Sequence, residues 1–527
     1  MPSSLRMGGT DPTVVETTKG RLRGSDAAGI LSFRGIRYGQ TTAGAHRFRA
    51  PLPAPRWAGI RDAISWGPSA PQSVPAAYTE PFYAWYSTIQ PISEDCLFLN
   101  VVTPAADRQS RPVMVWLHGG GWRNFSASAP GTDGTLLAMQ EDVVVVSLNH
   151  RLGALGYLAL GQDDERFADA GNAGLLDIML ALQWVRDNIA AFGGDPENVT
   201  IFGQSGGGAK VAALMAVPAA AGLFHRAIIQ SSSGGLRVAS YQEAKGLSQA
   251  LADTLGLARA DASILQAVPL DTLLSAIERT PGYFRPSIDG RTFRTDPFFP
   301  AAPKISNHVP LLAGCTNTET TYYMRRNPGS FHLDLPDVEA RLAGFLRLDA
   351  AATGRLIEAY RDLDSSAQPS DILIAVTTDY LFKRNTYRMA SLREGAGAPS
   401  FAYVFSFETA VENGLLRSPH TCELPFIFAS AGVARALVGH SCDIEPMTKT
   451  MMATWAQFAR SGNPDNPTLP KWRPFGEPDR PVMVLAPESQ LVADPGGDAR
   501  AMLDGLAFYE YNRSRDDFWS VNAPRAT

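Results

Sequence analysis

Four glycines surround one serine in the segment FGQSGGGAK, residues 202–210. Glycine costs backbone entropy inside a strand or helix, so this cluster indicates a geometric requirement. Gly203 to Gly207 fit the pattern G-x-S-x-G, with a strand-like apolar run before them and a helical pattern after them. That context is typical of a nucleophile elbow, a sharp turn that lifts a serine hydroxyl out of a sheet. We therefore predict that Ser205 is a nucleophile, with the start of a helix favouring negative charge beside it.

Two alternatives exist for this segment. A phosphate-binding loop would read G-x-x-x-x-G-K-[ST], but Ala209 separates Gly208 from Lys210, and Val211 stands where a hydroxyl is needed. A plain tight turn also uses glycine, although it does not require a strand before it and a helix after it. The surrounding pattern therefore favours the elbow over both.

A second glycine cluster, HGGGW at residues 118–122, ends an earlier apolar strand. Acyl transfer places negative charge on a carbonyl oxygen, and fixed N–H donors aimed at that oxygen are usually the largest catalytic contribution. HGGG is the motif that accompanies G-x-S-x-G elbows. We predict that the amides of Gly120, Gly121 and Gly206 form an oxyanion hole. A β-turn is the alternative for HGGGW taken alone.

The elements that must hold these two loops are recognisable from periodicity. Apolar strands at 112–117, 142–148, 198–203 and 226–229 alternate with helical patterns such as 171–192. Strands without polar alternation are buried on both faces, which indicates a mostly parallel sheet with helices on both sides. Ligands bind such sheets beyond the carboxyl ends of the strands, where both glycine loops fall. Ranges of about 238–285 and 324–395 are predicted to be helical excursions, within one domain spanning residues 1–527.

Composition excludes several other classes of function. The net charge is −5 over 527 residues with no basic stripe, which argues against nucleic acid or anionic membrane as a partner. The longest apolar runs, such as 143–146, are too short to span a bilayer, and the N-terminus lacks the apolar core of a secretory signal. Four cysteines require no disulfide framework. We expect a soluble cytoplasmic protein, monomeric or homodimeric, with no membrane anchor, metal or cofactor.

Taken together, several segments resemble the type-B carboxylesterase/lipase family, which includes bacterial esterases, cholinesterases and the non-enzymatic neuroligins. SEDCLFLNV at 93–101 and the stretch 171–208 are similar to two family signatures, and the resemblance extends from Val14 to Trp472. Shorter similar segments are FRGIRYG, VWLHGGGW, HRAIIQSSS and PSIDG. The resemblance implies an α/β-hydrolase fold with a gorge leading to the serine.

The resemblance also implies the other two catalytic residues. The family acid lies in G-x-N-x-x-E-G, and residues 314–320 (GCTNTET) match it with the asparagine shifted by one position and threonine in place of the last glycine, which assigns Glu319. The family histidine lies in H-x-x-E-L, which residues 420–424 fit, so the base is His420. From the residues alone, His420 would be one histidine of eight. The order serine, acid, histidine is the one expected of this fold.

The chain departs from the family near the serine. Gln204 replaces the usual glutamate and Gly206 the usual alanine, while Cys96 has no upstream cysteine with which to form the disulfide of cholinesterase-like relatives. Without a carboxylate at 204, we expect neutral esters to be preferred over choline esters, since a quaternary ammonium favours negative charge and aromatic faces.

Other residues receive weaker assignments. Gln204, Ser231, Trp122, Trp85 and Tyr86 are candidates for supporting the triad or lining the gorge, although aromatic clusters are as often core. We expect an Asp95–Arg151 salt bridge under the site and a structural ion pair for Glu423. For Cys315 and Cys422, which flank the predicted acid and base, the default is a reduced, packed state.

The expected reaction is hydrolysis of a small carboxylic ester through an acyl-enzyme. His420 takes the proton of Ser205, Glu319 orients the imidazole, and the three glycine amides hold the oxyanion. An amidase or carbamate hydrolase with the same triad is an alternative that the sequence does not separate. A neuroligin-like binding protein is a further alternative, but it would require a damaged triad, and none is visible.

Overall fold

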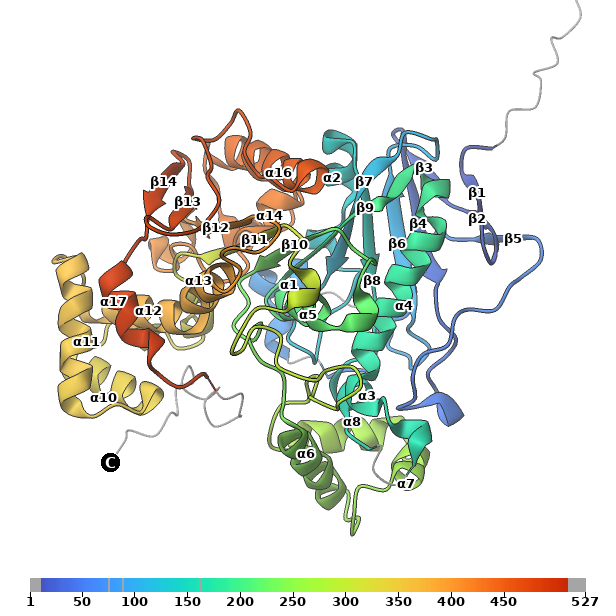
Figure 1. Ribbon diagram of the computed structural model, residues 1–527, viewed down its shortest axis with the longest axis horizontal. Coiled ribbons are helices and arrows are strands. Elements are labelled where there is room, and N and C mark those ends of the chain that lie inside the picture. The colour runs from blue at the N-terminus through green and yellow to red at the C-terminus, as the bar shows by residue number, and fades with distance from the viewer. Residues whose placement is uncertain (1–10, 74–75, 88–89, 161–163, 510–527) are drawn as a thin grey trace, which may run out of the picture.

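The computed structural model describes residues 11–509 apart from 74–75, 88–89 and 161–163. An eleven-stranded sheet crosses its centre in the order β14-β13-β12-β11-β10-β9-β7-β8-β6-β4-β3 (Figure 1). Neighbouring strands are parallel from β13 to β8 and antiparallel towards both edges. The predicted, mostly parallel sheet is therefore present, and its antiparallel edges are an addition to the prediction.

The central strands of this sheet are apolar and buried, whereas the edge strands β3 and β14 are largely exposed. Their bounds are β3 (Ser25–Ala27), β4 (Ile30–Arg37), β6 (Phe98–Thr103), β7 (Arg111–Leu117), β8 (Val144–Leu148), β9 (Gly194–Gln204), β10 (Arg226–Gln230), β11 (Leu311–Thr316), β12 (Ser400–Phe405), β13 (Pro481–Leu485) and β14 (Gln490–Ala493). A separate three-stranded sheet is formed by β1 (Val14–Thr17), β2 (Gly20–Arg23) and β5 (Ile60–Asp62).

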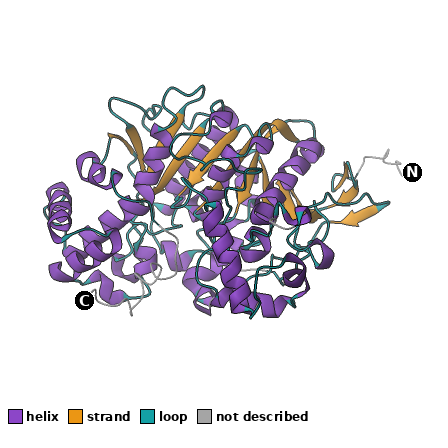
Figure 2. Ribbon diagram, turned by 60° about the horizontal axis from the view of Figure 1, so that its bottom comes forward, coloured by secondary structure: helices purple, strands orange, loops and turns teal. Residues whose placement is uncertain are grey.

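Side chains of the central strands alternate between two hydrophobic cores. In β7, Val113 and Val115 belong to one core, whereas Met114 and Trp116 belong to the other. Helices cover both faces of the sheet (Figure 2): α4, α5 and α13 contact it on one face, and α2 and α16 on the other. Burial on both faces explains why these strands read as continuous apolar runs.

Helices occupy both ranges that were predicted as excursions; treating residues 1–527 as one domain stays a prediction. The α-helices are α1 (Pro81–Ser87), α2 (Thr135–Glu141), α3 (Gly153–Tyr157), α4 (Ala173–Asn188), α5 (Gly206–Ala216), α6 (Tyr241–Thr254), α7 (Ala262–Ala267), α8 (Leu270–Arg279), α9 (Thr321–Met324), α10 (Leu335–Leu346), α11 (Ala350–Leu363), α12 (Pro369–Thr378), α13 (Arg384–Ser391), α14 (Leu424–Ile427), α15 (Arg435–Val438), α16 (Ile444–Ser461) and α17 (Gly497–Asp504).

Two expectations concern the surroundings of the protein. Within the described residues, no helix combines the length and apolarity needed to cross a bilayer. Part of the N-terminal stretch on which the cytoplasmic expectation depends, residues 1–10, lies outside the described residues.

The buried salt bridge beneath the sheet has a different acid from the one predicted. Arg151 donates to both carboxylate oxygens of Asp177 on α4, at 2.6 and 2.8 Å, and both side chains are buried. Asp95 instead pairs with Arg37 at 2.6 Å, and both of those side chains are about one-third exposed (27% and 35%). The predicted Asp95–Arg151 pair is therefore wrong, because Asp177 reaches Arg151 from a helix that the local sequence pattern does not relate to it.

The two pairs offer a matched test of stability. Asp177→Asn leaves the Arg151 guanidinium buried without a counter-charge, so we expect the free energy of unfolding to fall by about 3–5 kcal/mol. Asp95→Asn removes a solvent-screened pair and should cost less than about 1 kcal/mol. Urea unfolding monitored by tryptophan fluorescence gives both values. Equal losses would contradict the assignment of Asp177 as the buried partner.

Candidate active site

Ser205 occupies the turn between β9 and α5. Its φ is 59°, a left-handed value that residues other than glycine rarely adopt, which marks a strained turn. The turn is possible because its neighbours lack side chains: a Cβ on Gly207 would strike the carbonyl oxygen of Leu117, and one on Gly203 would strike the backbone of Gly207. The glycines at 203 and 207 thus clear the space that this sharp turn needs.

Glu319 and His420 come from two different loops and meet in the interior. Glu319 follows β11 and His420 precedes α14, and both are buried. Nδ1 of His420 hydrogen-bonds to one carboxylate oxygen of Glu319, while the other accepts from the main-chain N–H of Thr316 at 2.8 Å. With the proton on Nδ1, facing the carboxylate, the lone pair would be on Nε2, which is the tautomer that a general base requires.

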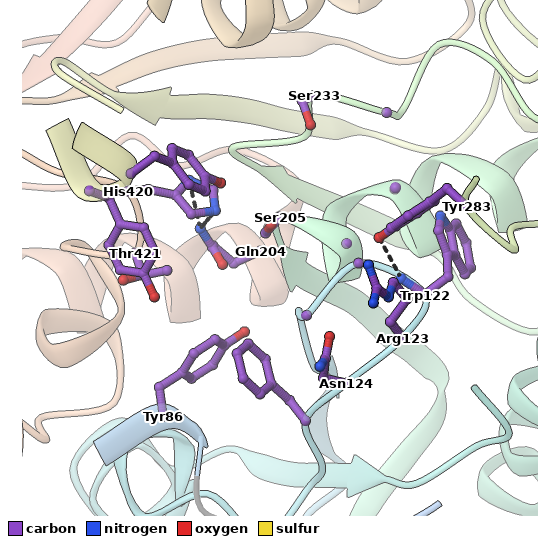
Figure 3. Close-up of a pocket in the computed structure, with 18 of the residues that line it drawn as sticks. Tyr86, Trp122, Arg123, Asn124, Gln204, Ser205, Ser233, Tyr283, His420 and Thr421 are labelled. Carbon is purple, nitrogen blue, oxygen red and sulfur yellow. Dashed lines mark hydrogen bonds between the residues drawn. The ribbon is translucent and has the colours of Figure 1, made fainter. Parts of the chain in front are cut away.

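Ser205 and His420 line the same cavity, whose volume is about 260 Å³. No described residue forms a hydrogen bond with the hydroxyl of Ser205. The amide nitrogen of Gln204 instead lies 3.2 Å from Nε2 of His420, as Figure 3 shows. The atom that would accept the serine proton is therefore contacted by Gln204, a contact that its position next to the serine did not predict.

The three glycines of the predicted oxyanion hole, Gly120, Gly121 and Gly206, line the same cavity as Ser205 and His420. None of the described residues accepts a hydrogen bond from the N–H groups of Gly120, Gly121 or Gly206. Gly206 and Gly121 are in close main-chain contact, because a Cβ on Gly206 would collide with the backbone of Gly121. Three unpaired donors thus gather beside the Ser205 hydroxyl.

Aromatic residues enclose the cavity. Tyr86 and Trp122 line it as predicted, whereas Trp85 packs against Gly131 in the core and is not among the lining residues. Tyr322 and Tyr323 also line the cavity and were not predicted; their ring centroids lie 5.7 and 5.6 Å from that of His420. Their position directly after the segment of Glu319 is the sequence signal that could have identified them.

Behind the site, Ser231 and Glu423 form a contact that differs from the predictions. Ser231 donates to Glu423 at 3.4 Å rather than to any of the three predicted catalytic residues. Glu423 has no ion pair among the described residues; Gln230 is its other donor, at 3.4 Å, and one of its oxygens has no partner. Burial, followed by the charge of Glu319, raises the pKa of Glu423 to about 8, so this carboxyl is neutral at pH 7.

None of the four cysteines is among the described residues that line the cavity. Cys96, Cys315 and Cys422 are buried, Cys442 is exposed, and all four are free thiols, so Cys315 and Cys422 are not bonded to each other. Burial raises the pKa of the Cys315 and Cys422 thiols. Over the described part of the chain, no three His, Cys, Asp or Glu side chains are placed to hold a metal ion.

Comparison with known proteins identifies the class. The profile of the carboxylesterase family matches residues 11–500, and the chain therefore belongs to this family of carboxylic-ester hydrolases. It is 34% identical to the para-nitrobenzyl esterase of Bacillus subtilis, over 93% of this chain and 98% of that protein. Phenmedipham hydrolase of Pseudarthrobacter oxydans is 35% identical, over 91% and 96% of the two chains.

Solved structures agree with this assignment. The carboxylesterase EST55 of Geobacillus stearothermophilus superposes with a TM-score of 0.81 at 35% identity, covering 93% of this chain and all of that one. A structure described as a thermophilic PNB esterase gives a TM-score of 0.79 at 32% identity, covering 94% of this chain and all of that one. The α/β-hydrolase fold and the family resemblance predicted from the sequence are both confirmed.

The neutral carboxyl of Glu423 predicts a pH-dependent difference in stability. Its pKa is about 8 in the folded state against 4.5 for an unperturbed glutamate, so the folded state binds more protons between these pH values. The free energy of unfolding therefore falls as the pH rises through that interval. Glu423→Gln cannot ionise and so lacks this loss. Between pH 5 and pH 9, the free energy of unfolding of the variant should therefore rise relative to that of the wild type by a few kcal/mol, at most roughly 5.

Chemical unfolding at the two pH values measures this gain. Glu445→Gln is the control, since Glu445 is exposed on α16, and its stability should parallel that of the wild type. If Glu423→Gln also runs parallel to the wild type, Glu423 is ionised in the folded protein.

Proposed function

We propose that the chain hydrolyses carboxylic esters through an acyl-enzyme in which Ser205 is the nucleophile. Nε2 of His420 takes the proton of Ser205 as its oxygen attacks the ester carbonyl. The N–H groups of Gly120, Gly121 and Gly206 hold the resulting oxyanion, each contributing on the order of 3 kcal/mol in comparable sites. His420 then protonates the leaving alcohol, and water repeats the cycle to release the acid.

The observation that carries this proposal is the orientation of His420. Glu319 binds Nδ1 of His420, which leaves Nε2 as the ring nitrogen for proton transfer. The imidazole ring lines the same cavity as Ser205. The Gln204 amide nitrogen lies 3.2 Å from Nε2 and 3.4 Å from Nδ1 of the same ring, so its side chain must leave Nε2 accessible to the serine hydroxyl for proton transfer. Catalytic hydrogen bonds that are absent without substrate often form only in its complex.

The lining of the cavity supports small, uncharged substrates. A volume of about 260 Å³ is slightly below the range of roughly 300–1,000 Å³ typical of ligand sites. Among the described lining residues there is no aspartate or glutamate, whereas Arg123 and Arg285 both line the cavity. Each arginine pairs with a glutamate outside the lining, Arg123 with Glu278 at 3.5 Å and Arg285 with Glu243 at 3.4 Å. A cationic alcohol group would therefore meet no carboxylate among the described lining residues, which agrees with the preference expected from Gln204.

Covalent labelling tests the nucleophile and the base. A fluorophosphonate probe should label the wild type and not Ser205→Ala, since the probe reports an activated serine. His420→Ala should lower kcat for p-nitrophenyl butyrate by roughly 10⁴-fold or more with little change in KM, because the base acts in the transition state. His440→Ala is the control: His440 is exposed, contacts Arg435, and should leave turnover unchanged. Labelling of Ser205→Ala would overturn the proposal.

A charge-matched substrate pair tests the preference for neutral esters. Acetylcholine and 3,3-dimethylbutyl acetate have the same shape and differ by one positive charge. We expect kcat/KM to favour the neutral ester by about tenfold or more, because the described lining offers two guanidinium groups and no carboxylate to a cation. The double variant Arg123→Gln, Arg285→Gln should reduce the ratio of kcat/KM for the neutral ester to kcat/KM for acetylcholine. A wild-type preference for acetylcholine would refute the expectation.

A further inference from the structure

Lys210 is a buried cation on α5 to which the mechanism above gives no role. Its side chain is fully buried one and a half helical turns after Ser205. The ammonium group donates to three main-chain carbonyl oxygens of the HGGGW loop: those of His118 at 2.8 Å, Gly121 at 3.0 Å and Gly119 at 3.4 Å. These three acceptors match the three donors of an ammonium group. In the sequence, Lys210 served only to exclude a phosphate loop.

The direction of these carbonyl groups determines where the amides of the loop point. The peptides of the loop are trans, so each C=O and the N–H of the next residue lie on opposite sides of the peptide plane. With the carbonyl of Gly119 directed at Lys210, the N–H of Gly120 is directed away from it. Gly120 and Gly121 both line the cavity, and none of the described residues accepts from their N–H groups.

Two tyrosine hydroxyls accept hydrogen bonds from the other side of the loop. The N–H of Gly119 donates to the hydroxyl of Tyr86 at 2.8 Å. The N–H of Trp122 donates to the hydroxyl of Tyr283 at 3.1 Å, as drawn in Figure 3. The carbonyl oxygens of the same two peptide groups, those of His118 and Gly121, accept from Lys210. The loop is thus fixed from both sides, and only the amides between the two tyrosine contacts are unpaired.

The charge of Lys210 is not neutralised by a carboxylate. Among the described residues, its hydrogen-bond partners are the three carbonyl oxygens, and the Trp122 ring lies 5.5 Å from the nitrogen. The titratable groups that face it, His118 and His150, stack on each other, and burial together with Lys210 holds the pKa of both well below its usual range. Burial lowers the pKa of Lys210 to about 7, whereas three acceptors favour its charged form.

We infer that Lys210 is a positioning residue of the oxyanion hole: its ammonium group orients the amide of Gly120 through the Gly119 carbonyl, holds the peptide groups on both sides of the Gly120–Gly121 peptide and adds positive charge behind them. The Gly121 amide belongs to that middle peptide, whose carbonyl accepts from the N–H groups of Arg123 and Asn124. The inference depends on the proposed ester hydrolysis. Because negative charge develops on the substrate carbonyl only in the transition state, Lys210 should affect kcat far more than substrate binding.

Lys210→Met removes the charge and the donors while keeping a long apolar side chain. We expect kcat for p-nitrophenyl butyrate to fall by roughly 30- to 300-fold with KM within about threefold, as for loss of an oxyanion donor. Affinity for a trifluoromethyl ketone, which forms a tetrahedral adduct with the serine, should fall by a similar factor. Affinity for the matching methyl ketone, which mimics the ground state, should not change.

Arg393→Met is the matched control. Arg393 is also a buried cation that donates to main-chain carbonyl oxygens, those of Ser306 at 3.1 Å and Val309 at 2.6 Å, but it does not line the cavity. Its loss should lower the unfolding midpoint and leave kcat within about twofold. If Lys210→Met does not fold, Lys210→Gln, which keeps two donors without the charge, is measured in the same way.

Two results would overturn the inference: a folded Lys210 variant with kcat within threefold of the wild type, or equal losses of affinity for both ketones. The second result would assign Lys210 to general support of the loop. Failure of the ester-hydrolase proposal is distinguishable, because a wild type that the fluorophosphonate probe does not label at Ser205 contradicts that proposal whatever Lys210 does.

Discussion

The contact between two stretches of bare main chain, the HGGGW loop and the turn after Ser205, determines how this site is built. Gly206 lies against Gly121, and Gly207 against Leu117, so closely that a methyl group at either position would collide with backbone atoms. The approach brings amides from two separate strand ends to one point. It also leaves no side chain between them, so the loop must be held from outside, by Lys210 on one side and by Tyr86 and Tyr283 on the other.

Several charged or polar side chains are buried around this site, and the cost of removing each from water is offset by a different kind of partner. Arg151 is matched by the carboxylate of Asp177, Lys210 by carbonyl oxygens, and Glu423 by retaining its proton. Glu319 is compensated by the Thr316 amide and by the imidazole. Of these four arrangements, only the last includes a side chain that lines the cavity, that of His420.

Local sequence was sufficient for the features that short motifs encode. G-x-S-x-G with its flanking periodicity placed Ser205 at a strand–helix turn, and continuous apolar strands indicated a sheet covered on both faces. Glu319 and His420 required the family resemblance, because nothing in the residues themselves relates two loops a hundred positions apart. The antiparallel edges of the sheet were not foreseen, since alternation in β3 and β4 does not report the direction of a neighbour.

The failed predictions concern partners brought together by tertiary packing. Asp95 was assigned to Arg151, but Asp177 reaches that guanidinium from α4, while Asp95 pairs with Arg37. Ser231 lies near the site yet donates to Glu423, and Trp85 faces the core although Tyr86 beside it faces the cavity. Such details follow from helix rotation and packing, which spacing along the chain does not specify.

The distribution of the thiols has a practical consequence. Three of the four cysteines are buried, and only Cys442, just before α16, is exposed. Maleimide reagents react with accessible thiolates, so the folded protein offers a single attachment point without any cysteine being removed. A fluorophore or a solid support coupled there would be bound in one defined orientation.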